Sequence, residues 1–363
     1  MTVHHNHART YQELAHQVRL QGLYRPAAGR ILLELAFHLC VGFGGLAIGI
    51  TAGQAWIKAV GFLVSATGAL GVTTNTHTSS HFATATHARI NRFLTYFGYT
   101  FLFGTSANYW WHKHCVVHHP TPNLIGIDDD ANLMPWFALN QKEFQSSKGL
   151  QRFFFRIQWL IVPLAIGLNV FNTQRQGWKF LLPLLLDRKK WKPTYGLDLG
   201  CLILHTTTWI LLPMAFFAPL DVLKVYLVEM MLVGYAMFIA FAPAHYPVEA
   251  VFADASEKEA DFVLRQTQTT VNFRTGWIGR LLCSGVDYQI EHHLFPSVPH
   301  VHYPELSRLV RKFCTDNDYP YRTLGWLEGV WKSLLIFRNP KPVLPNLVSR
   351  FSDPEKQLSM EAP

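Results

Sequence analysis

The sequence predicts an all-α integral membrane protein, with four transmembrane helices in two hairpins and a cytoplasmic helical cap. Three observations support this prediction. Charged residues make up only 15% of the chain, against about 25% in an ordinary soluble domain. The apolar residues form long runs instead of amphipathic stripes. Histidines cluster near the ends of these runs, in segments that we expect to form the cap.

Four apolar runs are long enough to cross a bilayer. Each is close to the roughly 20 apolar residues that span about 30 Å of hydrocarbon. We expect the spans at about residues 31–50, 55–73, 199–218 and 222–243. No small-residue cleavage site follows the first run, which indicates a retained helix and not a signal peptide.

Short linkers predict that these runs pair as two tight hairpins. The segment TAGQ joins the first two runs, and a turn at 219–221 joins the last two. Arginine and lysine concentrate before residue 31, through 74–197 and after residue 250. The positive-inside rule places these regions in the cytoplasm. The net charge of +8 follows from this topology, so we expect no nucleic-acid partner.

Residues 153–186 are harder to assign. Their first apolar piece is long enough to span but is interrupted by Arg156, Gln158 and Asn169, and their second piece is too short. A crossing by 153–171 alone would separate the third histidine cluster from the first two. We therefore expect an interfacial or re-entrant segment.

The first histidine cluster is HTSSH, at residues 77–81. The spacing of four residues puts His77 and His81 on one face of a helix, as ligands of a shared metal require. A pair of ordinary surface histidines on a helix is the alternative.

The second cluster is HKHCVVHH, at residues 112–119. His114 and His118 repeat the spacing of four residues. Pro120 disfavours helical backbone at His119, so we expect the helix to end there and His119 to turn toward the same centre. His112 lies on the opposite side of the helix from His114 and is either structural or close to the metal.

The third cluster is QIEHHLFP, which contains Gln289, His292 and His293. A single further candidate, His245, lies in FAPAHYP at the cytoplasmic end of the last span. A lone histidine in this position is either a ligand or a structural residue.

The number of histidines indicates two metal ions. Neutral imidazole binds iron, zinc, copper and nickel. Eight candidates are too many for one tetrahedral zinc: His77, His81, His114, His118, His119, His245, His292 and His293. Each ligand needs a partner for its other ring nitrogen, and the candidate carboxylates are Asp128, Asp129, Asp130, Glu249, Asp261 and Glu291.

The three clusters, read as HxxxH, HxxxHH and QxxHH around two hairpins, resemble the membrane fatty acid desaturase family. The resemblance runs from about residue 31 to residue 325. It includes Trp110 and Trp111 before the second cluster, PTPN after it, and the segment HLFPSVPHVHYPELSRLVRKFC. QIEHHLFP resembles the third histidine box of acyl-lipid and front-end desaturases, in which glutamine replaces the first histidine.

The resemblance implies a non-haem centre of two iron ions that activates dioxygen and removes two hydrogens from an acyl chain. It implies that the eight histidines are ligands and that Gln289 sits beside the metal. The first cluster departs from the family pattern, because relatives commonly have HDxxH there. We expect residues 1–30 to form a cytoplasmic N-terminal segment, 31–325 the desaturase domain, and 326–363 a C-terminal tail.

The resemblance also implies partners. The acyl substrate would be linked to a lipid, to coenzyme A or to a carrier protein. The sequence contains no His-Pro-Gly-Gly segment of a fused haem domain, so we expect a separate electron donor, a ferredoxin or a small cytochrome with its reductase. Arg308, Arg311 and Lys312 either dock an acidic carrier or contact lipid headgroups.

We expect an apolar substrate tunnel beneath the metals, with Trp110, Trp111, His38 and His205 as candidates. The alternative for the two intramembrane histidines is a structural hydrogen bond. A related outcome, acyl hydroxylation or acetylene formation, stays open. A zinc hydrolase or metal transporter is the competing class, although a transporter would place its ligands near the bilayer midplane.

Overall fold

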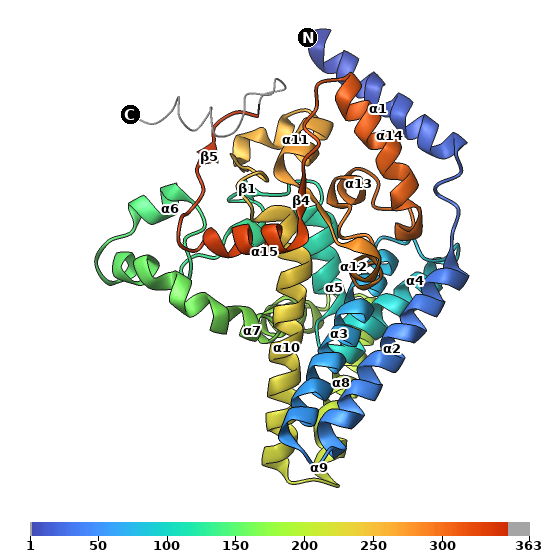
Figure 1. Ribbon diagram of the computed structural model, residues 1–363, viewed down its shortest axis with the longest axis vertical. Helices are drawn as coiled ribbons and strands as arrows, with labels where there is room; N and C mark the ends of the chain where they lie inside the picture. The colour runs from blue at the N-terminus through green and yellow to red at the C-terminus, as the bar shows by residue number, and fades with distance from the viewer. Residues whose placement is uncertain (1, 348–363) are drawn as a thin grey trace.

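Long apolar helices form a stem, and shorter helices form a cap at one end of it (Figure 1). The computed structural model describes residues 2–347, with side chains from residue 11 onward. We call α2, α3, α8 with α9, and α10 the stem, and α1 with α11 to α15 the cap. The fold is mostly helical, as the sequence predicts.

The elements have the following bounds. The long stem helices and α7 are α2 (Ala28–Thr51), α3 (Ala55–Ser80), α7 (Gly149–Leu186), α8 (Pro193–Thr206) and α10 (Pro219–His245). The other α-helices are α1 (Thr2–Leu20), α4 (Ala88–Thr95), α5 (Ala107–Trp110), α6 (Gln141–Ser146), α9 (Leu212–Met214), α11 (Phe262–Thr269), α12 (Gly276–Cys283), α13 (Gln289–Leu294), α14 (Tyr303–Asp316) and α15 (Trp326–Leu335). Three π-helical segments are η1 (Tyr96–Leu102), η2 (Trp111–His118) and η4 (Thr207–Leu211), and three 3₁₀ turns are η3 (Asp129–Ala131), η5 (Ala255–Glu259) and η6 (His300–His302).

The strands are short and form two small parallel sheets. Their bounds are β1 (Leu124–Ile125), β2 (Phe252–Asp254), β3 (Asn272–Arg274), β4 (Thr323–Gly325) and β5 (Val343–Leu344). One sheet has the order β1-β2-β5, and the other pairs β3 with β4.

Five helices among the described residues are long and apolar enough to cross a membrane, one more than the sequence analysis expected. The expected runs 31–50, 55–73 and 222–243 lie in α2, α3 and α10, whereas the expected run 199–218 overlaps the stretch Pro193–Met214 and extends past its end. The fifth helix is α7, which includes the whole of 153–186. The structure therefore gives one continuous helix where two apolar pieces were expected.

One of the polar residues of α7, Gln158, has its side-chain partners outside the helix. Gln158 is buried, and its amide group bonds to both the N–H and the carbonyl of Ala138. Figure 1 shows α7 running across α10 and not alongside it. The two helices meet at glycines, since a Cβ atom at Gly234 would lie 2.6 Å from the carbonyl oxygens of Ile166 and Gly167.

Small residues also bring α2 and α3 together. A side chain at Gly45 would collide with the backbone of Ser65, and one at Gly68 with the backbone of Gly42. Close backbone approach through small residues is the usual way in which helices associate within lipid. This packing fixes the first hairpin, whose cap-side end carries His77.

The cap has its own apolar core, which includes residues from both ends of the chain. Leu14 and Val18 of α1 pack with Leu306 and Val310 of α14. Residues 326–347, expected as part of a C-terminal tail, form α15 and β5, and β5 pairs with β2. The rest of that expected tail, 348–363, lies outside the described residues.

Candidate metal centre

Five histidine side chains meet at the junction of the stem and the cap. Their ring nitrogens all lie within 4.8 Å of one another, and the residues are buried: His77, His81, His114, His119 and His292. His114 is central, with its Nε2 atom 2.6 Å from Nε2 of His77 and 3.1 Å from Nε2 of both His81 and His119. We call these residues the five-histidine group.

A second group lies beside the first. It consists of His118, His245 and His293, whose ring nitrogens are again within 4.8 Å of one another. Gln289 approaches this group, with its Nε2 atom 2.8 Å from Nε2 of His245. We call these residues the three-histidine group. All eight histidines from the sequence analysis are thus gathered at one place.

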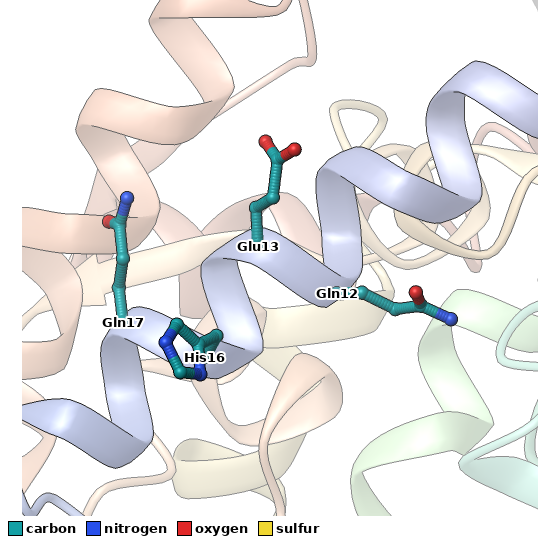
Figure 2. A pocket seen from close by; sticks show the side chains of 4 residues that line it. All are labelled: Gln12, Glu13, His16 and Gln17. Carbon is teal, nitrogen blue, oxygen red and sulfur yellow. The ribbon is translucent and has the colours of Figure 1, made fainter.

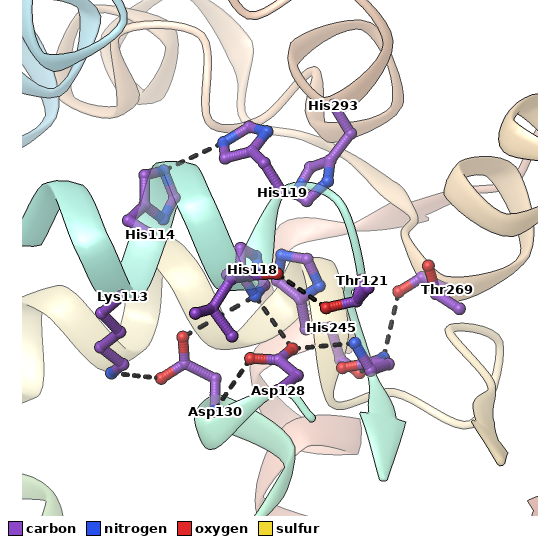
Figure 3. Close-up of polar contacts among 12 residues, drawn as sticks. Lys113, His114, His118, His119, Thr121, Asp128, Asp130, His245, Thr269 and His293 are labelled. Atoms are coloured by element: carbon purple, nitrogen blue, oxygen red, sulfur yellow. Dashed lines mark hydrogen bonds and ion pairs between the residues drawn. The ribbon is translucent and has the colours of Figure 1, made fainter. Parts of the chain in front are cut away.

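A π-helix decides how the second cluster is shared between the groups. The segment η2 spans Trp111–His118, and the N–H of His119 donates to the carbonyl of His114 at 3.0 Å, a step of five residues. This wider turn sets His119 beside His114 and turns His118 toward His245 (Figure 3). With α-helical spacing, His114 and His118 would have faced the same centre, as expected from the sequence.

Other side chains hold the outer nitrogens of the imidazoles. His118 Nδ1 lies 2.9 Å from Asp128 Oδ2, and His292 Nδ1 lies 3.0 Å from the Tyr303 hydroxyl. Such contacts fix the orientation of a metal-binding imidazole. Asp128 was expected in this role, whereas Tyr303 was not.

Gln266 connects the two groups and was also not anticipated. Its Oε1 atom lies 2.9 Å from His293 Nδ1, and its Nε2 atom donates to the carbonyl of His119 at 2.8 Å. The side chain is completely buried on α11. Nothing in the local sequence around Gln266 marks it, because both partners are distant in the chain.

Charged residues surround the three-histidine group on one side (Figure 3). The same Asp128 oxygen that meets His118 also accepts a hydrogen bond from the backbone N–H of Asn123 at 2.8 Å. Asp130 lies 3.8 Å from His118 and forms an ion pair with Lys113 at 2.6 Å. The three-histidine group therefore has a negatively charged outer layer.

The electrostatics keep most imidazoles of the five-histidine group neutral. Burial, together with the positive charge of His118, lowers the pKa of His81 to about 3. Burial and the neighbouring imidazoles also lower the pKa of His114, His119 and His292. For His118 burial opposes protonation, but the carboxylates of Asp128 and Asp130 together outweigh burial and raise the pKa.

These residues fit a pair of metal cations. The Nε2 atoms of His292 and His293 are buried and meet no hydrogen-bond partner among the described residues. Neutral imidazoles cannot satisfy one another where several nitrogens converge, since each ring has only one N–H. A cation between them would use their lone pairs, and an all-imidazole set suits a first-row transition metal.

Two other residues that were predicted near the metal, His112 and Glu291, have their partners outside the two histidine groups. His112 is exposed and stacks on Phe180 of α7, with ring centroids 5.2 Å apart. Glu291 is buried beside His292 but bonds to Asn272 and to Tyr321. Among the described residues, its side chain makes no hydrogen bond to an imidazole of either histidine group.

The two tryptophans before the second cluster have different surroundings. Trp110 is buried and stacks on His114, with centroids 4.5 Å apart, and on Tyr99, at 4.4 Å. Trp111 donates from Nε1 to the carbonyl of Ser80 at 3.0 Å. Trp110 thus covers the five-histidine group, and Trp111 ties the end of α3 to η2.

The two intramembrane histidines, His205 and His38, have different hydrogen-bond partners. His205 lies 2.8 Å from the carbonyl oxygen of Phe101 through Nδ1 and 2.8 Å from the Tyr226 hydroxyl through Nε2. His38 lies 3.2 Å from the carbonyl oxygen of Leu281. The hypothesis that either residue lines a substrate tunnel stays a prediction.

A surface hollow lies on α1, away from the two histidine groups (Figure 2). It is lined by the polar side chains of Gln12, Glu13, His16 and Gln17. A hollow lined by one polar helix face does not suit an acyl chain.

Comparisons with known proteins identify the family. The sequence model of the family described as "Fatty acid desaturase" matches residues 54–325. The chain is 26% identical to the Delta(5) fatty acid desaturase fat-4 of Caenorhabditis elegans, over 95% of this chain and 76% of that protein. It is 27% identical to the sn-1 linoleoyl-lipid 6-desaturase of Synechocystis, over 71% of this chain and 76% of that protein.

A plant relative gives the same result. The chain is 25% identical to Delta(8)-fatty-acid desaturase 2 of Arabidopsis thaliana, over 70% of this chain and 58% of that protein. Together with the buried histidine groups and the long apolar helices, these matches confirm the resemblance noted in the sequence and favour neither a hydrolase nor a transporter. The chain belongs to the fatty acid desaturase family and is an oxidoreductase of that family.

Proposed function

We propose that this desaturase holds two iron ions, one in each histidine group, and uses dioxygen to introduce a double bond into an acyl chain of a membrane lipid or another carrier. The observation that carries the proposal is the convergence of eight buried histidines in two adjacent groups. Iron is preferred to zinc because an unactivated methylene C–H bond requires an oxidant that side chains and zinc do not provide.

The bound metal pair would supply the oxidising power that removes two hydrogens from neighbouring carbons. The residues of the chain have three tasks around it. The neutral imidazoles would bind the metal ions. Asp128, Tyr303 and Gln266 would orient these imidazoles. Trp110, which stacks on His114 and on Tyr99, would exclude water. Fixed orientation and water exclusion are the protein's main contributions to such chemistry.

The topology that we propose keeps both groups on the cytoplasmic side. It is supported by the positions of the basic residues and by the two tight hairpin turns, which lie at the end of the stem opposite the cap (Figure 1). We propose that 31–325 is the catalytic domain. Whether α7 spans the bilayer or lies in its interface would be decided by labelling single cysteines introduced at its two ends.

We further propose a separate electron donor, a ferredoxin or a small cytochrome with its reductase. Arg308, Arg311 and Lys312 are exposed on α14, which is consistent with docking of an acidic carrier. Exchanging all three for glutamine should slow turnover at limiting carrier concentration. Turnover with a small chemical reductant should not change.

The test is expression in a host followed by mass spectrometry of its lipids. We expect new double bonds that require oxygen, and the first products to seek have unsaturation at positions 5, 6 or 8, because the relatives carry these numbers in their names. A hydroxylated or acetylenic product would favour the related outcome. Turnover without oxygen, or zinc in place of iron, would contradict the proposal.

A further inference from the structure

Lys341 is a buried lysine in the part of the chain that follows the family match. The match ends at residue 325, and Lys341 lies between α15 and β5. Its side chain is only 5% exposed. A buried ammonium group is costly unless its charge is balanced and its N–H groups have partners, so the surroundings of Lys341 must compensate for its burial.

Three carbonyl oxygens surround the ammonium group. Nζ of Lys341 donates to the carbonyls of His245 at 3.1 Å, Pro247 at 3.1 Å and Ala250 at 2.5 Å. Three acceptors match the three N–H bonds of a protonated lysine. The ring of Phe252, with its centroid 3.8 Å from Nζ, adds a cation–π contact.

The end of α10 explains why a cation belongs there. His245 is the last residue of this helix, and the last carbonyls of a helix have no partner within it and carry partial negative charge. Burial by itself lowers the pKa of Lys341. Glu249 opposes this shift, and the three carbonyls and the aromatic ring hold the Nζ group at the helix end.

The backbone of Lys341 is fixed independently of its side chain. Its N–H donates to the carbonyl of Leu139 at 2.9 Å, and its carbonyl accepts from the N–H of Gln141 at 2.8 Å. Two residues later, Val343 pairs with Phe252 as β5 joins β2. The side chain is therefore presented to the end of α10 by a segment that is itself held in place.

His245 is the residue through which this contact reaches the metal centre. Its carbonyl accepts from Lys341 and also from Nδ2 of Asn123, at 2.9 Å. The backbone N–H of Asn123 donates to the same Asp128 oxygen that meets His118. His245 is thus linked to Lys341 and to Asn123, and His118 is linked to Asn123 through Asp128.

We propose that Lys341 is a positioning residue for the three-histidine group: its ammonium group fixes the carbonyl of His245 and the loop that follows, and so sets the imidazole of His245 beside His118 and His293. Metal binding by this group then depends on the segment that follows α15. The inference rests on the proposed function, in that it takes the three-histidine group to bind a metal ion.

The test compares metal binding by purified full-length variants. Lys341→Met keeps the length of the side chain and removes the charge. In a chelator titration we expect one of the two ions to be released at roughly 10–100-fold lower chelator concentration, as for other residues that support metal ligands, with the second ion unchanged. Lys224→Met is the control, because Lys224 pairs with Asp221 in the first turns of α10, at the opposite end of that helix from His245.

A double variant separates positioning from general destabilisation. If Lys341 acts through His245, Lys341→Met should cause no further loss of metal in a His245→Ala background. Equal weakening of both ions, or additive loss in the double variant, would overturn the proposal. If Lys341→Met does not accumulate, Lys341→Gln replaces it, and unchanged metal binding by that variant would equally overturn the proposal. A wild-type protein without metal would instead contradict the proposed function.

Discussion

The two histidine groups differ in the number of imidazoles and in what supports them. One group has five imidazoles, with His114 at its centre, whereas the other has only three, including that of His118. The smaller group has the acidic outer layer of Asp128 and Asp130, and its member His245 is held through its backbone carbonyl. The larger group is covered by the rings of Trp110 and Tyr99.

This difference indicates that the groups have different tolerance to change. The five-histidine group has two imidazoles more than the three-histidine group, so it has ligands in reserve. The three-histidine group has none and depends on its outer contacts. Variants in the two groups should therefore separate metal loss from activity loss.

The largest effect is expected for His293→Ala. The three-histidine group would keep only two imidazoles, so the purified protein should lose about one ion per chain and desaturation should fall to background. Metal analysis and lipid profiling measure the two effects. His302→Ala is the control, because His302 contacts the carbonyl of Arg25 and neither group. Full metal content in His293→Ala would remove this residue from the ligand set.

The second effect concerns the carboxylate behind His118. Asp128→Asn removes the charge that supports this imidazole, and metal affinity of the three-histidine group should weaken roughly 10–100-fold. Chelator titration checks this, with the neighbouring exposed Asp129→Asn as the control. Equal affinities of the two variants would show that the charge of Asp128 is not needed.

A smaller effect on metal content is expected for His81→Ala. Four imidazoles remain in the five-histidine group, enough to retain its ion, so the purified protein should keep both ions while its spectrum changes. Metal analysis with absorption spectroscopy tests this. Loss of the ion would mean that the group has no imidazole in reserve.

The smallest effect is expected for Tyr303→Phe. It removes one hydrogen bond, to His292, which is worth about 1 kcal/mol, or less than about tenfold in metal affinity. The same chelator titration measures it. A loss as large as that of Asp128→Asn would contradict the ranking of the two groups.

The sequence predicted the stem and the histidines, because apolar runs and metal-ligand spacing are local patterns. It did not predict how the histidines divide, since the spacing of His114 and His118 reads as one α-helical face and only the π-helix separates them. Gln266, Tyr303 and Lys341 were missed for a different reason. Each acts on a residue at least eleven positions away, through contacts that exist only in the folded chain.

Mössbauer spectroscopy of the protein loaded with ⁵⁷Fe tests the central claim, that the eight histidines form two unequal iron sites. Unequal ligand sets give each iron its own signal. We predict two distinct signals of equal intensity in the wild-type protein and selective loss of one of them in His293→Ala. A single iron signal, or equal loss of both signals in that variant, would contradict the account.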